Sequence, residues 1–112
     1  MIIPTTHNLD DIIKGTTYDP EAMVIIVDGV IKDDLAECVV SLVIHKGDVV
    51  YATLTSGSGL IVDAANGTIS PYLTVTQTSL YTVDQYDYYL NIIEPDGTTI
   101  YRYSEGIVEV RA

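Results

Sequence analysis

The sequence predicts an all-β domain, and three observations lead to this prediction. Short runs rich in Val, Ile, Tyr and Thr recur at close intervals along the 112 residues. Gly, Pro, Asn and Asp separate these runs. No amphipathic stretch with a helical period appears. The chain is short enough to form one domain over residues 1–112 with a single core, so the pattern is typical of an antiparallel β-sandwich or barrel.

The segments expected to be strands follow one another with little between them. They are residues 22–27, 38–45, 49–55, 60–62, 68–75, 86–94, 99–104 and 106–110. Residues 1–11 precede them and form either an ordered strand or an extended arm that reaches a neighbouring subunit. Pro71 falls inside one run. Because proline has no N–H to donate, we expect Pro71 at a sheet edge or a bulge.

Three dipeptides predict tight turns between these strands. They are Asp28-Gly29, Asn66-Gly67 and Asp96-Gly97. Each pair tolerates the positive φ that short hairpin loops require. The three dipeptides are therefore expected at hairpin tips.

The two faces of the central strands are both rich in apolar residues. Alternation predicts the core stripes Val40, Leu42 and Ile44, then Tyr86, Tyr88, Leu90 and Ile92, then Val108 and Val110. On the opposite faces, Val39 and Val43 flank a serine, and Tyr89 and Ile93 follow polar residues. A second subunit covers these outer positions, or another part of the chain does, and the sequence leaves both readings open.

Tyrosine supplies all the aromatic side chains, because the chain has nine Tyr and neither Phe nor Trp. A tyrosine combines apolar area with a hydroxyl that seeks a partner, which suits a half-buried interface. We therefore expect Tyr89, Tyr101 and Tyr103 to contact a partner. The alternative is that they serve only as strand-forming residues of the core.

The charge of the chain excludes two classes of partner. Sixteen acidic residues against five basic ones give a net charge of −11. Phosphate backbones and anionic lipids repel such a chain, so neither nucleic acid nor a membrane surface is expected as a partner. No apolar run is long enough for a membrane span, and the first residues lack the features of a secretory signal.

Few residues suggest a catalytic or metal-binding site. Cys38 lies in an apolar run, which predicts a buried, inert thiol. His7 and His45 belong to no nucleophile motif. Asp10-Asp11 and Asp33-Asp34 lack the spacing of a calcium loop, although a loop calcium site remains an alternative. We expect no catalytic residue, no metal and no cofactor, and therefore no enzyme.

Four segments occur in an order that points to a family. Ile12-Ile13-Lys14-Gly15-Thr16-Thr17-Tyr18 leads into the first strand, and Asp34-Leu35-Ala36 precedes an alternating strand. Residues 59–69 form an apolar strand that returns through Asn66-Gly67, and residues 86–97 continue to a closing strand at 105–110. From residue 12 to residue 110, this order resembles the small immunoglobulin-like domain of tailed bacteriophage structural proteins, such as the amino-terminal domain of baseplate upper proteins.

The resemblance implies an immunoglobulin-like antiparallel β-sandwich of about seven or eight strands. It also implies a non-enzymatic virion protein, assembled in the cytoplasm of a bacterial host, that docks tail, baseplate or fibre proteins or decorates the capsid. The alternative function is a cell-surface adhesin or a carbohydrate-binding sandwich that presents a tyrosine platform.

The candidate interface combines the apolar outer positions with the tyrosines. It consists of Val39, Val43, Tyr89, Ile93, Tyr101 and Tyr103. We expect identical copies to associate through this face into a homo-oligomer, while acidic loops keep free subunits apart before assembly.

Overall fold

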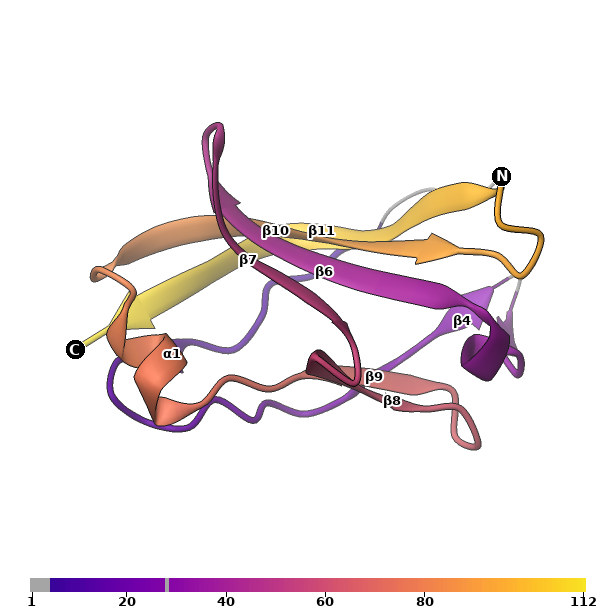
Figure 1. The fold of residues 1–112 in the computed structure, drawn as a ribbon, viewed down its shortest axis with the longest axis horizontal. Helices are drawn as coiled ribbons and strands as arrows, with labels where there is room; N and C mark the ends of the chain where they lie inside the picture. The colour runs from indigo at the N-terminus through magenta and orange to yellow at the C-terminus, as the bar shows by residue number, and fades with distance from the viewer. Residues whose placement is uncertain (1–4, 28) are drawn as a thin grey trace.

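The structure, a computed structural model, describes residues 5–27 and 29–112 and is mostly β (Figure 1). One large sheet curls around the core, and a hairpin forms a small second sheet. The predicted all-β class is therefore confirmed.

The large sheet runs in the order β1-β11-β10-β6-β7-β8-β9-β3, and β2 also pairs with β11. Its strands are β1 (Thr5–Thr6), β2 (Ile12–Ile13), β3 (Met23–Val24), β6 (Val39–Lys46), β7 (Val49–Ser56), β8 (Gly59–Asp63), β9 (Thr68–Pro71), β10 (Asp84–Ile93) and β11 (Ile100–Arg111). The hairpin consists of β4 (Ile26–Val27) and β5 (Val30–Ile31), and the helical elements are a 3-10 turn η1 (Leu35–Glu37) and a short helix α1 (Val75–Ser79).

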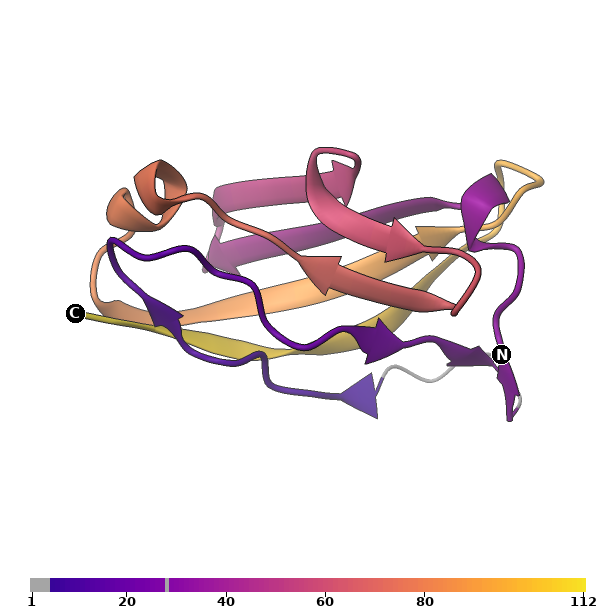
Figure 2. The same ribbon diagram turned by 90° about the horizontal axis from the view of Figure 1, so that it is seen from below.

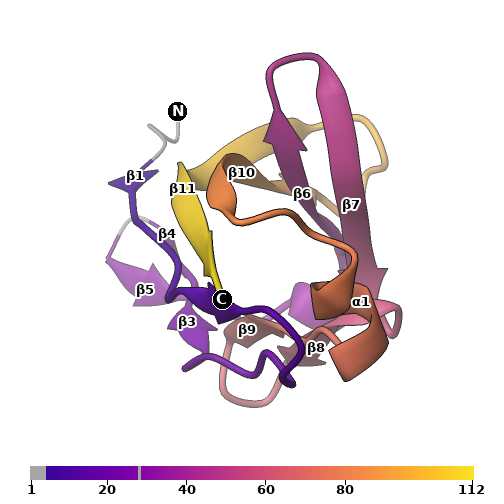
Figure 3. The ribbon, with the colours of Figure 1, turned by 90° about the vertical axis from the view of Figure 1, so that its left-hand side faces the viewer.

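The sheet changes layer between β7 and β8. Strands β6, β7, β10 and β11 pair antiparallel on one side of the core, and β8, β9 and β3 lie on the other (Figures 2 and 3). At the change of layer, Thr55 and Ser58 exchange two backbone hydrogen bonds of 2.8 and 3.0 Å. Gly59 follows with φ +96°, where a Cβ would lie 2.6 Å from Leu54 Cδ2. A glycine is therefore required where the chain bends against its own core.

The predicted core stripes are confirmed. Val40, Leu42, Ile44, Tyr86, Tyr88, Leu90, Ile92, Val108 and Val110 are all buried, and so is Cys38. The three predicted turns are also found between paired strands, and Gly29, Gly67 and Gly97 have positive φ. Asp28 lies outside the described residues. Alternation thus predicts the inner face of the long strands correctly.

Two predicted strands have different limits in the structure. Residues 22–27 divide into β3 and β4 because Ile25 is fully buried between them and its N–H donates to Gly67 O at 2.8 Å. The strand predicted for 68–75 ends at Pro71, which is buried and pairs with Leu60. Pro71 is therefore the last residue of its strand, and Leu60 is its only sheet partner among the described residues, which fits the expected position at an open edge.

Two further elements, α1 and β11, differ from the prediction. Thr74 caps α1 through a capping box with Gln77, so a helix replaces the end of the predicted strand. The strands predicted for 99–104 and 106–110 form one strand, β11, whose pairing with β10 shifts register between Leu90 and Asn91. A β-bulge, rather than a turn, thus absorbs the break in alternation.

Residues 5–14, the N-terminal segment, run parallel to β11 along its outer edge. The N–H groups of His7, Leu9 and Lys14 donate to the backbone oxygens of Glu105, Ile107 and Arg111 at 2.9, 3.0 and 2.7 Å. Within residues 5–11, Thr5–Thr6 form the short strand β1, and His7 and Leu9 continue along β11 through backbone hydrogen bonds; residues 1–4 lie outside the description. Within residues 5–27 and 29–112, no helix is long and apolar enough to cross a membrane.

Candidate functional site

The outer face of the long strands carries a row of aliphatic side chains at one end. Ile93 of β10 pairs with Ile100 of β11 on one side and with Val39 of β6 on the other. Ile100 is 60% exposed and Val39 is 57% exposed, whereas Ile93 between them is half-buried. The register therefore brings three apolar side chains from three strands together on the surface.

The small hairpin adds two more exposed aliphatic side chains. Val30 and Ile31 of β5 are 67% and 53% exposed. Lys32 follows them and lies 2.8 Å from Glu94, the residue after Ile93. β4 and the end of β10 accordingly lie at the same end of the molecule (Figure 1). We call Val30, Ile31, Val39, Ile93 and Ile100 the apolar end.

A lysine-centred cluster holds this end together. Lys32 is 9% exposed, and its ammonium lies 2.8 Å from both Asp34 and Glu94. Cys38 Sγ lies 3.9 Å from the Asp34 carboxylate. Ligand atoms of Asp34, Cys38 and Glu94 fall within 4.8 Å of one another, a spacing that suits a metal ion. Lys32 already supplies the positive charge there, so the arrangement works as a clamp that joins β5, η1 and β10.

The cluster shifts the pKa values of Lys32, Asp34 and Cys38. Burial acts to lower the pKa of Lys32, but its hydrogen bonds with Asp34 and Glu94 outweigh burial and raise the pKa above its usual value. The bond from Lys32 lowers the pKa of Asp34. Burial raises the pKa of Cys38. The ions stay paired at neutral pH and the thiol stays protonated, as expected for a structural cluster.

The six predicted interface residues occupy different environments. Val39 and Ile93 lie in the apolar end. Val43 is only 8% exposed, since it pairs with Tyr89 on one side and Thr53 on the other, and it therefore offers little surface to a partner. Tyr89 is half-buried on the same outer face. The Arg102 guanidinium lies 4.1 Å from the centre of its ring, which gives a cation–π contact that covers one face of the ring.

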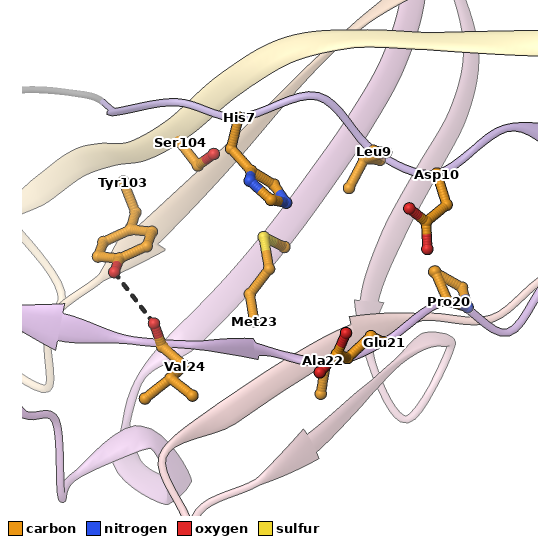
Figure 4. A pocket seen from close by; sticks show the side chains of 10 residues that line it. All are labelled: His7, Leu9, Asp10, Pro20, Glu21, Ala22, Met23, Val24, Tyr103 and Ser104. Carbon is orange, nitrogen blue, oxygen red and sulfur yellow. Dashed lines mark hydrogen bonds between the residues drawn. The ribbon is translucent and has the colours of Figure 1, made fainter.

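Tyr101 and Tyr103 pack against the core. Tyr103 accepts a hydrogen bond from Ile26 N at 3.0 Å and donates one to Val24 O at 3.2 Å, so it braces β11 against the segment that leads into the hairpin (Figure 4). Desolvation is the main reason that the pKa of Tyr101 is raised to about 12. Both tyrosines are therefore partly buried against the core, which leaves less of each side chain for a partner.

A groove lies between the N-terminal segment and β3, where the curled sheet stays open (Figure 4). Its volume is about 400 Å³. It is lined by His7, Leu9, Asp10, Pro20, Glu21, Ala22, Met23, Val24, Tyr103 and Ser104. The lining contains both polar and apolar side chains.

The sequence analysis missed Val30, Ile31 and Ile100 as candidate contacts. The sequence did contain a signal for Val30 and Ile31. These two residues directly follow the turn Asp28-Gly29, and because both are apolar, neither face of this short strand presents a polar side chain to solvent. The partners of Lys32 gave no such signal, since Glu94 is distant in the chain and only folding brings it near.

No protein-family model matches this chain, and no curated protein matches its sequence. The resemblance to the phage domain therefore stays a prediction, and the arguments for function rest on the surface of the molecule itself.

Proposed function

We propose that the chain is a non-enzymatic structural protein of a tailed phage virion, whose immunoglobulin-like domain docks tail, baseplate or fibre proteins or decorates the capsid. The order of sequence segments supports the family. The two layers around one core support a sandwich. The observation that carries the docking function is the exposed apolar end.

The apolar end is costly to leave in water. Fully burying one Val or Ile side chain contributes roughly 1.5–3 kcal/mol. Pairing brings Val39, Ile93 and Ile100 side by side, and the hairpin at the same end of the molecule adds Val30 and Ile31; four of the five are more than half exposed. Exposed apolar side chains gathered in this way, as Val39, Ile93 and Ile100 are, support a contact with another protein.

The charges around the apolar end indicate what kind of partner would fit it. Asp33, Asp34, Glu94 and Asp96 lie in the segments that follow β5 and β10, and Lys32 balances only part of their charge. An acidic rim around an apolar centre fits a partner with apolar side chains surrounded by Lys or Arg. Another virion protein of that chemistry is the partner we propose, with homo-oligomeric assembly on the particle.

Quantitative mass spectrometry of purified particles from the source phage or lysogen tests the proposal. Copy number near that of the major capsid protein indicates capsid decoration, and a small fraction indicates a tail, baseplate or fibre position. Absence of the chain from clean particles overturns the virion function.

A variant pair tests the docking surface. Ile100→Glu places a charge in the apolar end, and we expect incorporation into particles to fall about tenfold or more, because a buried unpaired charge costs several kcal/mol. Ile61→Glu is the matched control, since Ile61 is 52% exposed on β8. Equal incorporation of both variants, with both still folded, would show that docking uses another surface.

The alternative of a carbohydrate-binding module needs an exposed aromatic platform. Tyr89 does not provide a free one, because Arg102 covers one face of its ring. Binding to a glycan array that is lost in Tyr89→Ala would favour this alternative over docking.

A further inference from the structure

Strand β7 has a free edge. Along residues 49–54 its only sheet partner among the described residues is β6, and β8 joins it only at Thr55 and Ser56. The neighbouring long strands differ, because β6 and β10 pair on both sides and the N-terminal segment covers β11. Among the four long strands, β7 is therefore the one whose edge is open over most of its described length.

Proteins usually protect such an edge with charge, proline or a bulge. Residues 49–56 contain no charged residue and no proline, although the chain as a whole has a net charge of −11. One protective feature is present, since Val50 and Ala52 pair with consecutive residues of β6 and Tyr51 is the extra residue of a bulge. The bulge leaves residues 52–54 as the regular part of the free edge.

A groove of about 290 Å³ runs beside this part of the edge. It is lined by Tyr51, Ala52, Thr53, Leu54, Leu73, Gln77, Leu80 and Tyr81. Leu80 is 79% exposed there. Tyr81 is 4% exposed, and its hydroxyl has no hydrogen-bond partner within the described part of the chain.

The unpaired hydroxyl of Tyr81 indicates that the groove is incomplete. Leaving a buried polar group unpaired costs about 1–3 kcal/mol. A strand added to β7 brings a row of backbone donors and acceptors to the same groove, and Leu80 is placed to pack on its side chains. The groove therefore suits an extended strand.

We propose that the added strand is β7 of a second copy, paired antiparallel about a two-fold axis at Thr53. Ala52 then faces the partner's Leu54, and the two sheets join into one across the dimer. A strand paired with its own copy about a two-fold axis is self-complementary, so residues 52–54 of each copy form the contact.

The charge distribution favours a second copy in this orientation. Two copies with a net charge of −11 each repel one another, so they approach best along an uncharged surface such as β7. Asp48 precedes β7, and antiparallel pairing about Thr53 holds it roughly 30 Å from the partner's Asp48, well beyond the screening length. Parallel pairing would set the two carboxylates side by side.

Sedimentation equilibrium of the purified chain tests the dimer without any virion component, so its outcome is independent of the proposed function. We expect a concentration-dependent monomer–dimer equilibrium. Thr53→Lys and Thr53→Asp each place like charges opposite one another at the axis, and each is expected to weaken the dimer about tenfold. An equimolar mixture of the two variants restores dimerisation, because opposite charges then face each other.

Thr76→Lys is the matched control, since Thr76 is exposed on α1, does not line the groove, and its replacement changes the charge equally. It is expected to dimerise like the wild type. A wild-type chain that stays monomeric up to about 1 mM overturns the proposal. So does a dimer that survives Thr53→Lys and is lost in Ile100→Lys, because the copies then meet through the apolar end.

Discussion

The two edges of the long-stranded layer are treated in opposite ways. At the β11 edge, the N-terminal segment pairs with the strand, and three of its N–H groups donate to β11 carbonyls. At the β7 edge, residues 49–54 have no such cover within the described residues. The chain therefore covers one edge with its own residues and, among the described residues, leaves the other uncovered.

Two buried tyrosines show the same difference at atomic scale. Tyr88, near the closed edge, donates from its hydroxyl to His7 O and pairs with Ser104 Oγ at 2.8 Å. Tyr81, at the open edge, has a buried hydroxyl without a described partner, and burial raises the pKa of Tyr81 to about 12. The buried hydroxyl of Tyr101 in β11 also has no hydrogen-bond partner among the described residues, so the contrast concerns Tyr88 and Tyr81 and not every polar group at each edge.

The largest expected effect comes from Gly106→Ala, which breaks the closed edge. A Cβ at Gly106 would collide with His7 O and lie 2.9 Å from Asn8 Oδ1. Because the obstacle is backbone, the N-terminal segment must move away from β11. We expect the free energy of unfolding to fall by about 2–3 kcal/mol, measured by urea denaturation.

Gly97→Ala is the control for that variant. Gly97 has φ +76° and nothing within 4 Å of an added Cβ, so it reports backbone strain alone, worth about 1 kcal/mol. If Gly106→Ala costs no more than Gly97→Ala, and amide exchange of residues 5–14 stays unchanged, the N-terminal segment is not held against β11 as described.

Replacing Tyr88 and Tyr81 tests the comparison of the two edges, and the expected effects on stability are smaller. Tyr88→Phe leaves His7 O and Ser104 Oγ without their partner, so we expect a loss of about 1–2 kcal/mol in the free energy of unfolding. Tyr81→Phe removes a hydroxyl that has no hydrogen-bond partner among the described residues, so it should be neutral or slightly stabilising in the monomer. Urea denaturation at low protein concentration, where the dimer dissociates, measures both.

The opposite ranking would contradict this account of the two edges. If Tyr81→Phe costs as much as Tyr88→Phe, the Tyr81 hydroxyl has a partner, such as an ordered water, and the groove beside β7 is already complete. Such a result would also remove one support of the proposed dimer.

The sequence predicted the inner face of the long strands because alternation is a local property. Leu42 and Leu90, for example, lie on stripes that any register of the buried face must preserve. The turns at Gly67 and Gly97 were equally local. Helix α1 was missed because its five residues are mostly β-branched or polar, and the capping box of Thr74 and Gln77 overrides their strand preference.

The candidate sites depend on contacts that are distant in the chain. Tyr103 was chosen as a partner contact, yet its hydroxyl bonds to Val24 and Ile26 from the opposite end of the sequence. Val43 looked like an outer-face contact, but its neighbours on β7 and β10 bury it. Periodicity gives the face of a residue and not how much its neighbours cover it, so the outer face could be predicted only in part.

The smallest expected effect tests the turn that joins β10 to β11, away from both edges. Asp96 accepts hydrogen bonds from Thr99 Oγ1 at 2.6 Å and from the N–H groups of Thr98 and Thr99 at 2.8 Å. These bonds, the Thr99 hydroxyl first, lower the pKa of Asp96 from 3.8 to about 2. A carboxyl group whose pKa is lower in the folded chain stabilises it above its unfolded pKa and loses that effect as the pH falls. As the pH falls from about 4 to 2, the wild type should therefore lose slightly more stability than Asp96→Asn. Above pH 5, Asp96→Asn should be slightly less stable than the wild type. Denaturation series across this range measure the difference, and parallel curves for the two proteins would show that the Asp96 carboxylate does not hold the turn.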